Sequence, residues 1–250
     1  MRHSSSPFAW PHDHHDQTEE LQAEKGTSLV LLPLFGTVAF YLLPDAQQQR
    51  TLVQFMPQLL AYLGFAIWAC VNDHVSTRIG LRRNQLVEGI GMGSLVGLTL
   101  GLANTGIILY LVPFLGKDIT FLTNTPHAQA PVWMMVPWTI VIIAIAVELN
   151  FRGFLLGRLI TSLASLQRHS RTIHGKRKPF TPLLAILLSA LVFAFDPFMV
   201  ATFQHLHWIA VWDGLVWGWM WVQSRNLYSV ITAHAVEVIV LYSLIKAALT

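Results

Sequence analysis

Residues 136–153 read VPWTIVIIAIAVELNFRG, and this stretch decides what kind of protein the chain can form. Its first half carries no charge, as expected of a helix that crosses a lipid bilayer. Its second half nevertheless holds Glu148 and Arg152, which are four residues apart and therefore share one face of a helix. Ionisable groups are costly to bury at membrane depth, so they face the interior of a helix bundle and often mark a functional site.

The composition of the whole chain is that of a membrane protein. Hydrophobic residues make up 54% of the chain and charged residues only 12%, with a mean hydropathy of +0.51. Soluble domains are about one quarter charged. The 250 residues have room for about seven or eight spans of about 20 residues each. We therefore predict an all-α, polytopic transmembrane helix bundle of about seven or eight helices.

Apolar runs separated by polar loops predict where the spans lie. The predicted spans are 28–44, 52–71, 89–115, 131–150, 181–200, 205–223 and 228–248. Residues 151–166 continue the fourth helix, which would be about 54 Å long against a hydrocarbon core of about 30 Å. Either Pro137 kinks this helix or its second half leaves the bilayer. In the third span, Gly93, Gly97 and Gly101 stand four residues apart, which favours close helix packing over nucleotide binding.

Basic residues gather in three loops. They are Arg78, Arg82 and Arg83, then Arg168, Arg171, Lys176, Arg177 and Lys178, and finally Arg225. Seven spans place all three loops on one side, which the positive-inside rule makes cytoplasmic. We expect a cytoplasmic N-terminus in a bacterial inner (plasma) membrane. The net charge of +3 then reflects loop bias, and no nucleic-acid partner is expected.

Three regions are predicted. Residues 1–26 form a flexible polar tail containing HDHHD at 12–16, for which adventitious metal binding is a better explanation than a dedicated site. Residues 27–130 hold the N-terminal transmembrane helices, and 131–250 form the core. The single cysteine, Cys70, is expected to be a buried thiol, and no metal or cofactor is expected.

Further polar candidates lie late in the chain. His234 stands inside an apolar span and is the strongest of them. Asp196 precedes a proline, and His205 and His207 stand beside the outer end of a span, where they are either solvated or functional. Asp213 with Gly214 is interpreted as a helix irregularity. Five tryptophans between 208 and 221 indicate an interfacial belt and packing, with a pigment or haem site as the alternative.

Three motifs carry a family resemblance. The stretch VELNFRGFLLGRL resembles the first motif of the CPBP family, the type II CAAX-prenyl and bacteriocin-processing (Abi) intramembrane proteases, in which the pattern is Glu-Glu-x-x-x-Arg. SALVFAFDP is similar to the second motif, Phe-x-x-x-His. DGLVWGWMWVQSRNLYSVITAHAVEV is similar to the third region, which ends in His-x-x-x-Asn. The resemblance covers roughly 131–245 and implies a CPBP-like helical core.

The family residues carry over unevenly. The resemblance assigns water activation to the first glutamate of the pair, and that position is Val147 here. The second glutamate matches Glu148 and the arginine matches Arg152. On a regular helix, Glu148 lies about 100° away from position 147, and its pairing with Arg152 opposes a role as base.

The other two motifs are equally incomplete. The histidine of the second motif falls at Pro197, although a shift of one residue would place Asp196 there. The histidine of the third motif matches His234, but its asparagine falls at Val238. Most of the polar groups to which the family owes its activity are therefore replaced.

Three functions stay open on these residues. The first is a CPBP-like protein that has lost proteolysis and serves as a membrane scaffold, chaperone or accessory subunit with a membrane-protein partner. The second is a divergent protease that cleaves a peptide or prenylated substrate with Glu148 and His234, helped by His205 or His207. The third is an unrelated membrane subunit of a cofactor-bearing complex, in which the Glu148–Arg152 ion pair is structural.

Overall fold

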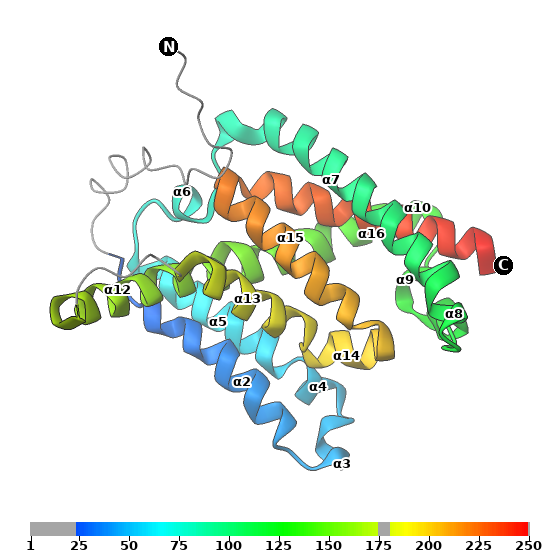
Figure 1. Ribbon diagram of the computed structural model, residues 1–250, viewed down its shortest axis with the longest axis horizontal. Helices are drawn as coiled ribbons and strands as arrows, with labels where there is room; N and C mark the ends of the chain where they lie inside the picture. Colours follow the sequence, from blue (N-terminus) through cyan, green and yellow to red (C-terminus); the bar gives the residue numbers. More distant parts are fainter. Residues whose placement is uncertain (1–23, 175–180, 250) are drawn as a thin grey trace.

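The computed structural model describes residues 24–174 and 181–249, and within these residues every regular element is a helix (Figure 1). The predicted all-α fold is therefore confirmed. The HDHHD cluster at 12–16 and the basic residues at 176–178 lie outside the described residues.

Each of the seven predicted apolar segments is helical, and shorter helices lie between some of them. In chain order the elements are η2 (Thr27–Val30), α2 (Leu31–Tyr41), α3 (Asp45–Gln48), α4 (Thr51–Gln54), α5 (Met56–Val71), α6 (Val75–Ile79), η3 (Arg83–Gln85), α7 (Leu86–Gly106), η4 (Ile107–Leu111), α8 (Val112–Phe114), η5 (Thr120–Asn124), α9 (Pro126–Gln129), α10 (Val132–Pro137), η6 (Trp138–Ile145), α11 (Ala146–Glu148), η7 (Leu149–Leu156), α12 (Gly157–His174), α13 (Thr181–Ala194), α14 (Pro197–Phe203), η8 (Gln204–Leu206), α15 (Trp208–Ser224) and α16 (Leu227–Leu249). The elements η4, η6 and η7 are π-helical, and the other η elements are 3-10 turns.

Three helices are long and apolar enough to cross a membrane. They are Val75–Phe114, Trp133–Gln167 and Leu227–Leu249. Thr181–Ala194 and Pro197–Leu206, bent by 56°, make a fourth if the pair is one broken span. The other predicted spans correspond to shorter helices: α5, with 16 residues, is about 24 Å long. The described residues thus hold three or four helices of full spanning length, as an integral membrane protein requires.

Contacts at one end of the bundle join distant parts of the chain. Glu24 forms ion pairs with Arg158 on α12 and with Arg78 on α6, the latter at 3.9 Å. The amide of Leu227, which begins α16, donates to the carbonyl of Gly80 after α6 at 2.8 Å. We call this the basic end, because the predicted loop of Arg78–Arg83 and the α15–α16 turn meet there.

The opposite end has its own contacts. The hydroxyl of Tyr41, at the end of α2, donates to the carbonyl of Phe195 at 2.8 Å, and the Lys246 ammonium donates to the carbonyl of Ala128 at 3.1 Å. The apolar segments therefore alternate in direction between the two ends, with the C-terminus far from the basic end (Figure 1).

A helix of 35 residues runs without a break from Trp133 to Gln167. Pro137 does not interrupt it. A proline lacks the amide that would bond to the preceding turn, and the π-helical turns of η6 follow it directly. From Asn150 to Leu159 every residue is buried. The second half of this helix therefore lies at the centre of the protein. The two predicted alternatives, a kink at Pro137 and an exit of the second half from the bilayer, would both have exposed it.

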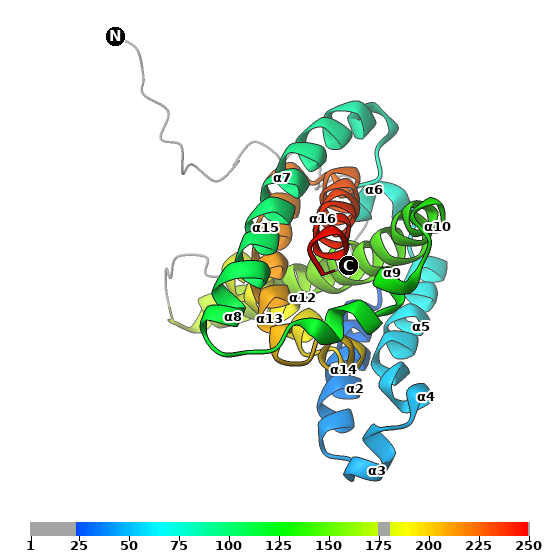
Figure 2. The same cartoon turned by 90° about the vertical axis from the view of Figure 1, so that its right-hand side faces the viewer.

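The α2–α5 hairpin packs on this central helix and projects to one side (Figure 2). Trp68 of α5 is fully buried against Phe154 of the central helix, with ring centroids 6.1 Å apart. Cys70 lies on the outward face of α5 and is exposed. The expectation of a buried thiol is therefore wrong, because Cys70 stands two residues away from the inward-facing Trp68.

The closest helix contact joins α7 to α16. A Cβ at Gly97 would collide with the carbonyl oxygen of Ala233, and one at Gly93 would come within 2.7 Å of the Cβ of Thr232. At Gly101 it would lie 2.9 Å from the Cβ of Val240. The predicted role of these small residues in close packing is confirmed, because each is a point where the two helices touch.

Gly97→Ala should lower the free energy of unfolding in detergent by about 1–3 kcal/mol, since the new methyl group must push the rigid backbone of α16 away. Gly91→Ala is the matched control on the same helix, because nothing lies within 4 Å of its Cβ. It should be neutral or stabilise by up to about 1 kcal/mol. Equal thermal midpoints for the two variants would contradict the close packing.

Candidate functional site

The site begins with the Glu148 carboxylate, which has no exposure to solvent. Its Oε1 accepts from Nη1 of Arg152 at 3.1 Å and lies 2.7 Å from Nδ1 of His234. Glu148 and Arg152 come from adjacent turns of the central helix, and His234 comes from α16. The predicted ion pair and the predicted histidine therefore meet at one oxygen atom.

Aromatic rings enclose these charges. The guanidinium carbon of Arg152 lies 4.7 Å from the ring centre of Phe193 and 5.0 Å from that of Trp217. The His234 ring stacks on Trp217, with centroids 4.5 Å apart and an interplanar angle of 20°. Cation–π attraction and stacking hold both side chains in place where no water competes. Residues from all three segments that carry the predicted motifs, Arg152, Phe193 and Trp217, therefore lie together.

The chain around Glu148 departs from a regular α-helix. The short α11 that carries it lies between the π-helical segments η6 and η7. π-Helical turns are rare and occur frequently at functional sites. Glu148 and Arg152 still pair across one turn (i,i+4) despite this irregularity, and Val147 packs against the hydrophobic core. The position to which the resemblance assigns a water-activating carboxylate is therefore occupied by the hydrocarbon side chain of Val147.

A second buried polar cluster lies beside the first. The side-chain amide of Asn104 on α7 donates to Oδ1 of Asp213 at 3.0 Å and to Oε1 of Glu237 at 2.7 Å. All three residues are buried. We call Asn104, Asp213 and Glu237 the acid cluster. It draws together α7, α15 and α16.

This cluster corrects the interpretation of Asp213. The helix α15 continues without irregularity from Trp208 to Ser224. Gly214 is instead a point of close packing, because a Cβ there would lie 2.9 Å from the Cα and Cβ of Ala190. The spacing of the residues contained a usable signal: Asp213 is one turn from Trp217, and Glu237 is one turn from His234. Asn104 stood in a glycine-rich helix and was not singled out.

Several polar atoms of the two clusters have no hydrogen-bond partner among the described residues. They are Oε2 of Glu148, Nε and Nη2 of Arg152, Nε1 of Trp217, Oε2 of Glu237 and Oδ1 of Asn104. Buried polar atoms without partners cost free energy. The site therefore retains donors and acceptors beyond those that its own contacts use.

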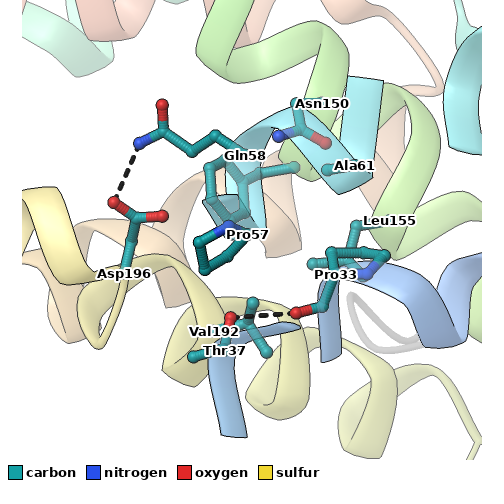
Figure 3. Close-up of a pocket in the computed structure, with 10 residues that line it drawn as sticks. Pro33, Thr37, Pro57, Gln58, Ala61, Asn150, Leu155, Val192 and Asp196 are labelled. Carbon is teal, nitrogen blue, oxygen red and sulfur yellow. Dashed lines mark hydrogen bonds between the residues drawn. The ribbon is translucent and has the colours of Figure 1, made fainter. Parts of the chain in front are cut away.

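Asp196 lies in a different environment (Figure 3). Its carboxylate caps α14 by accepting from the amide of Phe198 at 3.1 Å, and it also accepts from Nε2 of Gln58 at 2.8 Å. Figure 3 shows Gln58 reaching Asp196 across a small recess that Asn150 of the central helix also lines. Pro197 is the first residue of α14, where proline is favoured. This part of the second motif makes a helix cap.

The histidines at 205 and 207 lie in the turn between α14 and α15. The ring of His205 meets Phe121 edge-on with centroids 5.4 Å apart. Nδ1 of His207 lies 2.7 Å from the carbonyl oxygen of Gln204. Their contacts are with this turn and its neighbours, and the Glu148 contacts come from Arg152 and His234. Neither histidine joins the candidate site.

Within 24–174 and 181–249, no group of three or more His, Cys, Asp or Glu side chains is arranged to hold a metal ion.

Val238, the residue that the resemblance places at the asparagine of the third motif, follows the buried Glu237 on α16 and is half-buried. The arrangement can hold buried charges firmly and donate hydrogen bonds, and it places an imidazole against a carboxylate.

These features define a class: a helical integral membrane protein whose motif regions meet at a buried glutamate, arginine and histidine. A family model described as type II CAAX prenyl endopeptidase Rce1-like matches residues 129–240. Residues 129–240 are thus similar to the Rce1-like family, and the predicted CPBP resemblance is confirmed. Searches of the curated proteins and of the solved structures give no significant match.

Arg152→Ala should lower the free energy of unfolding by about 3–5 kcal/mol, because it leaves the Glu148 carboxylate buried without its cation. Arg152→Lys keeps the charge and should cost less. Arg50→Ala, at an exposed position, is the control and should stay within about 0.5 kcal/mol of wild type. Thermal unfolding in detergent measures all three. Wild-type stability of Arg152→Ala would show that the pair contributes nothing.

Asn104→Leu should cost at least about 2 kcal/mol, because two buried carboxyl groups lose their shared donor. Adding Asp213→Asn should recover part of the loss, since the new amide can donate to Glu237. Thr99→Val, at an exposed position on the same helix, serves as the control. An unchanged unfolding midpoint for Asn104→Leu would refute the acid cluster.

Proposed function

We propose that this protein is a non-catalytic Rce1-like membrane protein that acts as a scaffold, chaperone or accessory subunit. The observation that carries the proposal is the state of Glu148: its Oε1 is engaged by both Arg152 and His234, and the carboxylate is inaccessible to solvent. Glu148, the carboxylate of the first motif that this chain keeps, therefore serves to hold the helices together.

The chemistry of peptide hydrolysis supports this proposal. Glutamate-dependent cleavage needs a carboxylate that takes a proton from water and donors that stabilise the oxyanion. Val147, Pro197 and Val238 can do neither. Loss of one oxyanion donor alone typically costs about 10²–10³-fold in rate. After these three replacements, Glu148 and His234 are the motif residues left for proton transfer. Oε1 of Glu148 and Nδ1 of His234 already bond to each other.

A divergent protease is the second candidate, and one observation favours it. Glu148 and His234 are in direct contact, as a carboxylate–imidazole couple would have to be. Both also keep a further polar nitrogen or oxygen beyond that contact. For such an enzyme the substrate would be a membrane-embedded or prenylated peptide. The family match argues against the third interpretation, an unrelated membrane subunit.

The proposal also covers the membrane in which the protein lies and the boundary between its N-terminal helices and its core. The basic end, with Arg78 and the α15–α16 turn beside Glu24, supports a cytoplasmic N-terminus in a bacterial inner membrane. The start of the family match at residue 129 supports a division between N-terminal helices and a core near residue 130. A membrane-protein partner would then meet the lipid-facing surface of this bundle.

Purified protein in lipid vesicles should not cleave a farnesylated CAAX peptide above the rate in empty vesicles. Glu148→Gln should give the same background, since the proposal assigns Glu148 no chemical step. Mass spectrometry of the peptide measures both. Cleavage by wild type that Glu148→Gln abolishes, with the variant still folded, would overturn the proposal and establish the protease.

A further inference from the structure

A groove with a volume of about 570 Å³ lies between α7 and α15, away from the Glu148 site. Residues from the first half of α7 and the second half of α15 line it, and α16 runs between these two helices in Figure 1. Its lining residues are Gln85, Glu88, Met92, Val96, Val216, Trp219, Met220, Gln223, Ser224 and Asn226. The volume is that of a site for one small molecule or one hydrocarbon chain with its head.

The groove changes from polar to apolar along its length. The polar end of the groove lies at the basic end of the bundle. It is lined by Gln85 and Glu88, at the start of α7, and by Gln223 and Ser224, at the end of α15. Val96 and Val216 lie about 12 Å further along their helices, at 1.5 Å per residue. Two helices running in opposite directions therefore place their polar ends together. This polarity is that of an amphiphile lying along the membrane normal.

The polar end offers acceptors. Oε1 of Gln85 is buried and has no hydrogen-bond partner among the described residues. The Glu88 carboxylate lies one turn further along α7 and lines the same space. Asn226 is already engaged, donating to the Gln85 carbonyl at 2.8 Å and accepting from the Tyr228 amide at 3.1 Å. A cation that carries N–H donors would satisfy both free acceptors.

The nearest arginine lies outside the lining of the groove. Arg225 stands between the lining residues Ser224 and Asn226 in the sequence, but its guanidinium carbon lies 4.5 Å from the ring centre of Trp221, which is fully buried in the core. The polar end of the groove therefore presents acceptors for an ammonium group.

We propose that the α7–α15 groove binds a membrane phospholipid with a primary-amine head group, of the phosphatidylethanolamine type. Its ammonium lies between Gln85 and Glu88, and one acyl chain follows Met92 and Val96 along the groove. A quaternary ammonium head has no N–H to donate and fits less well. A head group with only a negative charge would face Glu88 without compensation.

Titration of the full-length protein in detergent, followed by native mass spectrometry, tests this directly. The probes are phosphatidylethanolamine, phosphatidylcholine and phosphatidylglycerol with identical acyl chains. Wild type should bind the ethanolamine lipid at least about fivefold more tightly than the choline lipid, the worth of one charge-assisted hydrogen bond at an exposed site. Glu88→Gln should remove most of that preference.

Two further variants separate the groove from general lipid contact. Asp45→Asn also neutralises an acid in a first helical turn, but on α3 at the opposite end, and should keep the preference. Met92→Trp should weaken binding of all three lipids by filling the chain path. Equal affinity of wild type for the ethanolamine and choline lipids, tighter binding of phosphatidylglycerol, or an unchanged preference in Glu88→Gln would each overturn the proposal.

Discussion

The rest of the structure depends on one constraint, the burial of the Glu148 carboxylate. A charge with no exposure to solvent must find its partners inside the protein, and Arg152 and His234 supply them. The guanidinium in turn needs an environment that favours a cation without water, and the faces of Phe193 and Trp217 provide one. Four helices are thereby tied to one carboxylate.

The close approach of α7 and α16 has a similar consequence. Glycines at successive turns let the two backbones touch, and this contact places Asn104 within reach of Glu237 on α16. A pair of buried carboxyl groups then shares one amide donor. The acid cluster and the Glu148 cluster lie on adjacent turns of α15 and α16, so the interior of the bundle is polar along one continuous stripe.

The motif positions differ in what they contribute to the fold. Val147 packs against the core and Pro197 starts α14, so both side chains fit their local structure. Loss of Glu148 or Arg152 would be different, since each compensates the buried charge of the other. Glu148, Arg152 and His234 therefore have a structural role whatever chemistry the proposed function assigns to them.

The sequence by itself determined the helical segments, their membrane character and the Glu148–Arg152 pair, because each depends on hydropathy or on a spacing of four residues along one helix. The tertiary structure alone decided that His234, 86 residues from Glu148, completes the pair. It also decided that Asn104 joins Asp213 to Glu237, that Asp196 caps a helix, and that His205 and His207 lie apart. Those contacts depend on how closely helices approach and how they are rotated. Packing sets both, and no local periodicity encodes them.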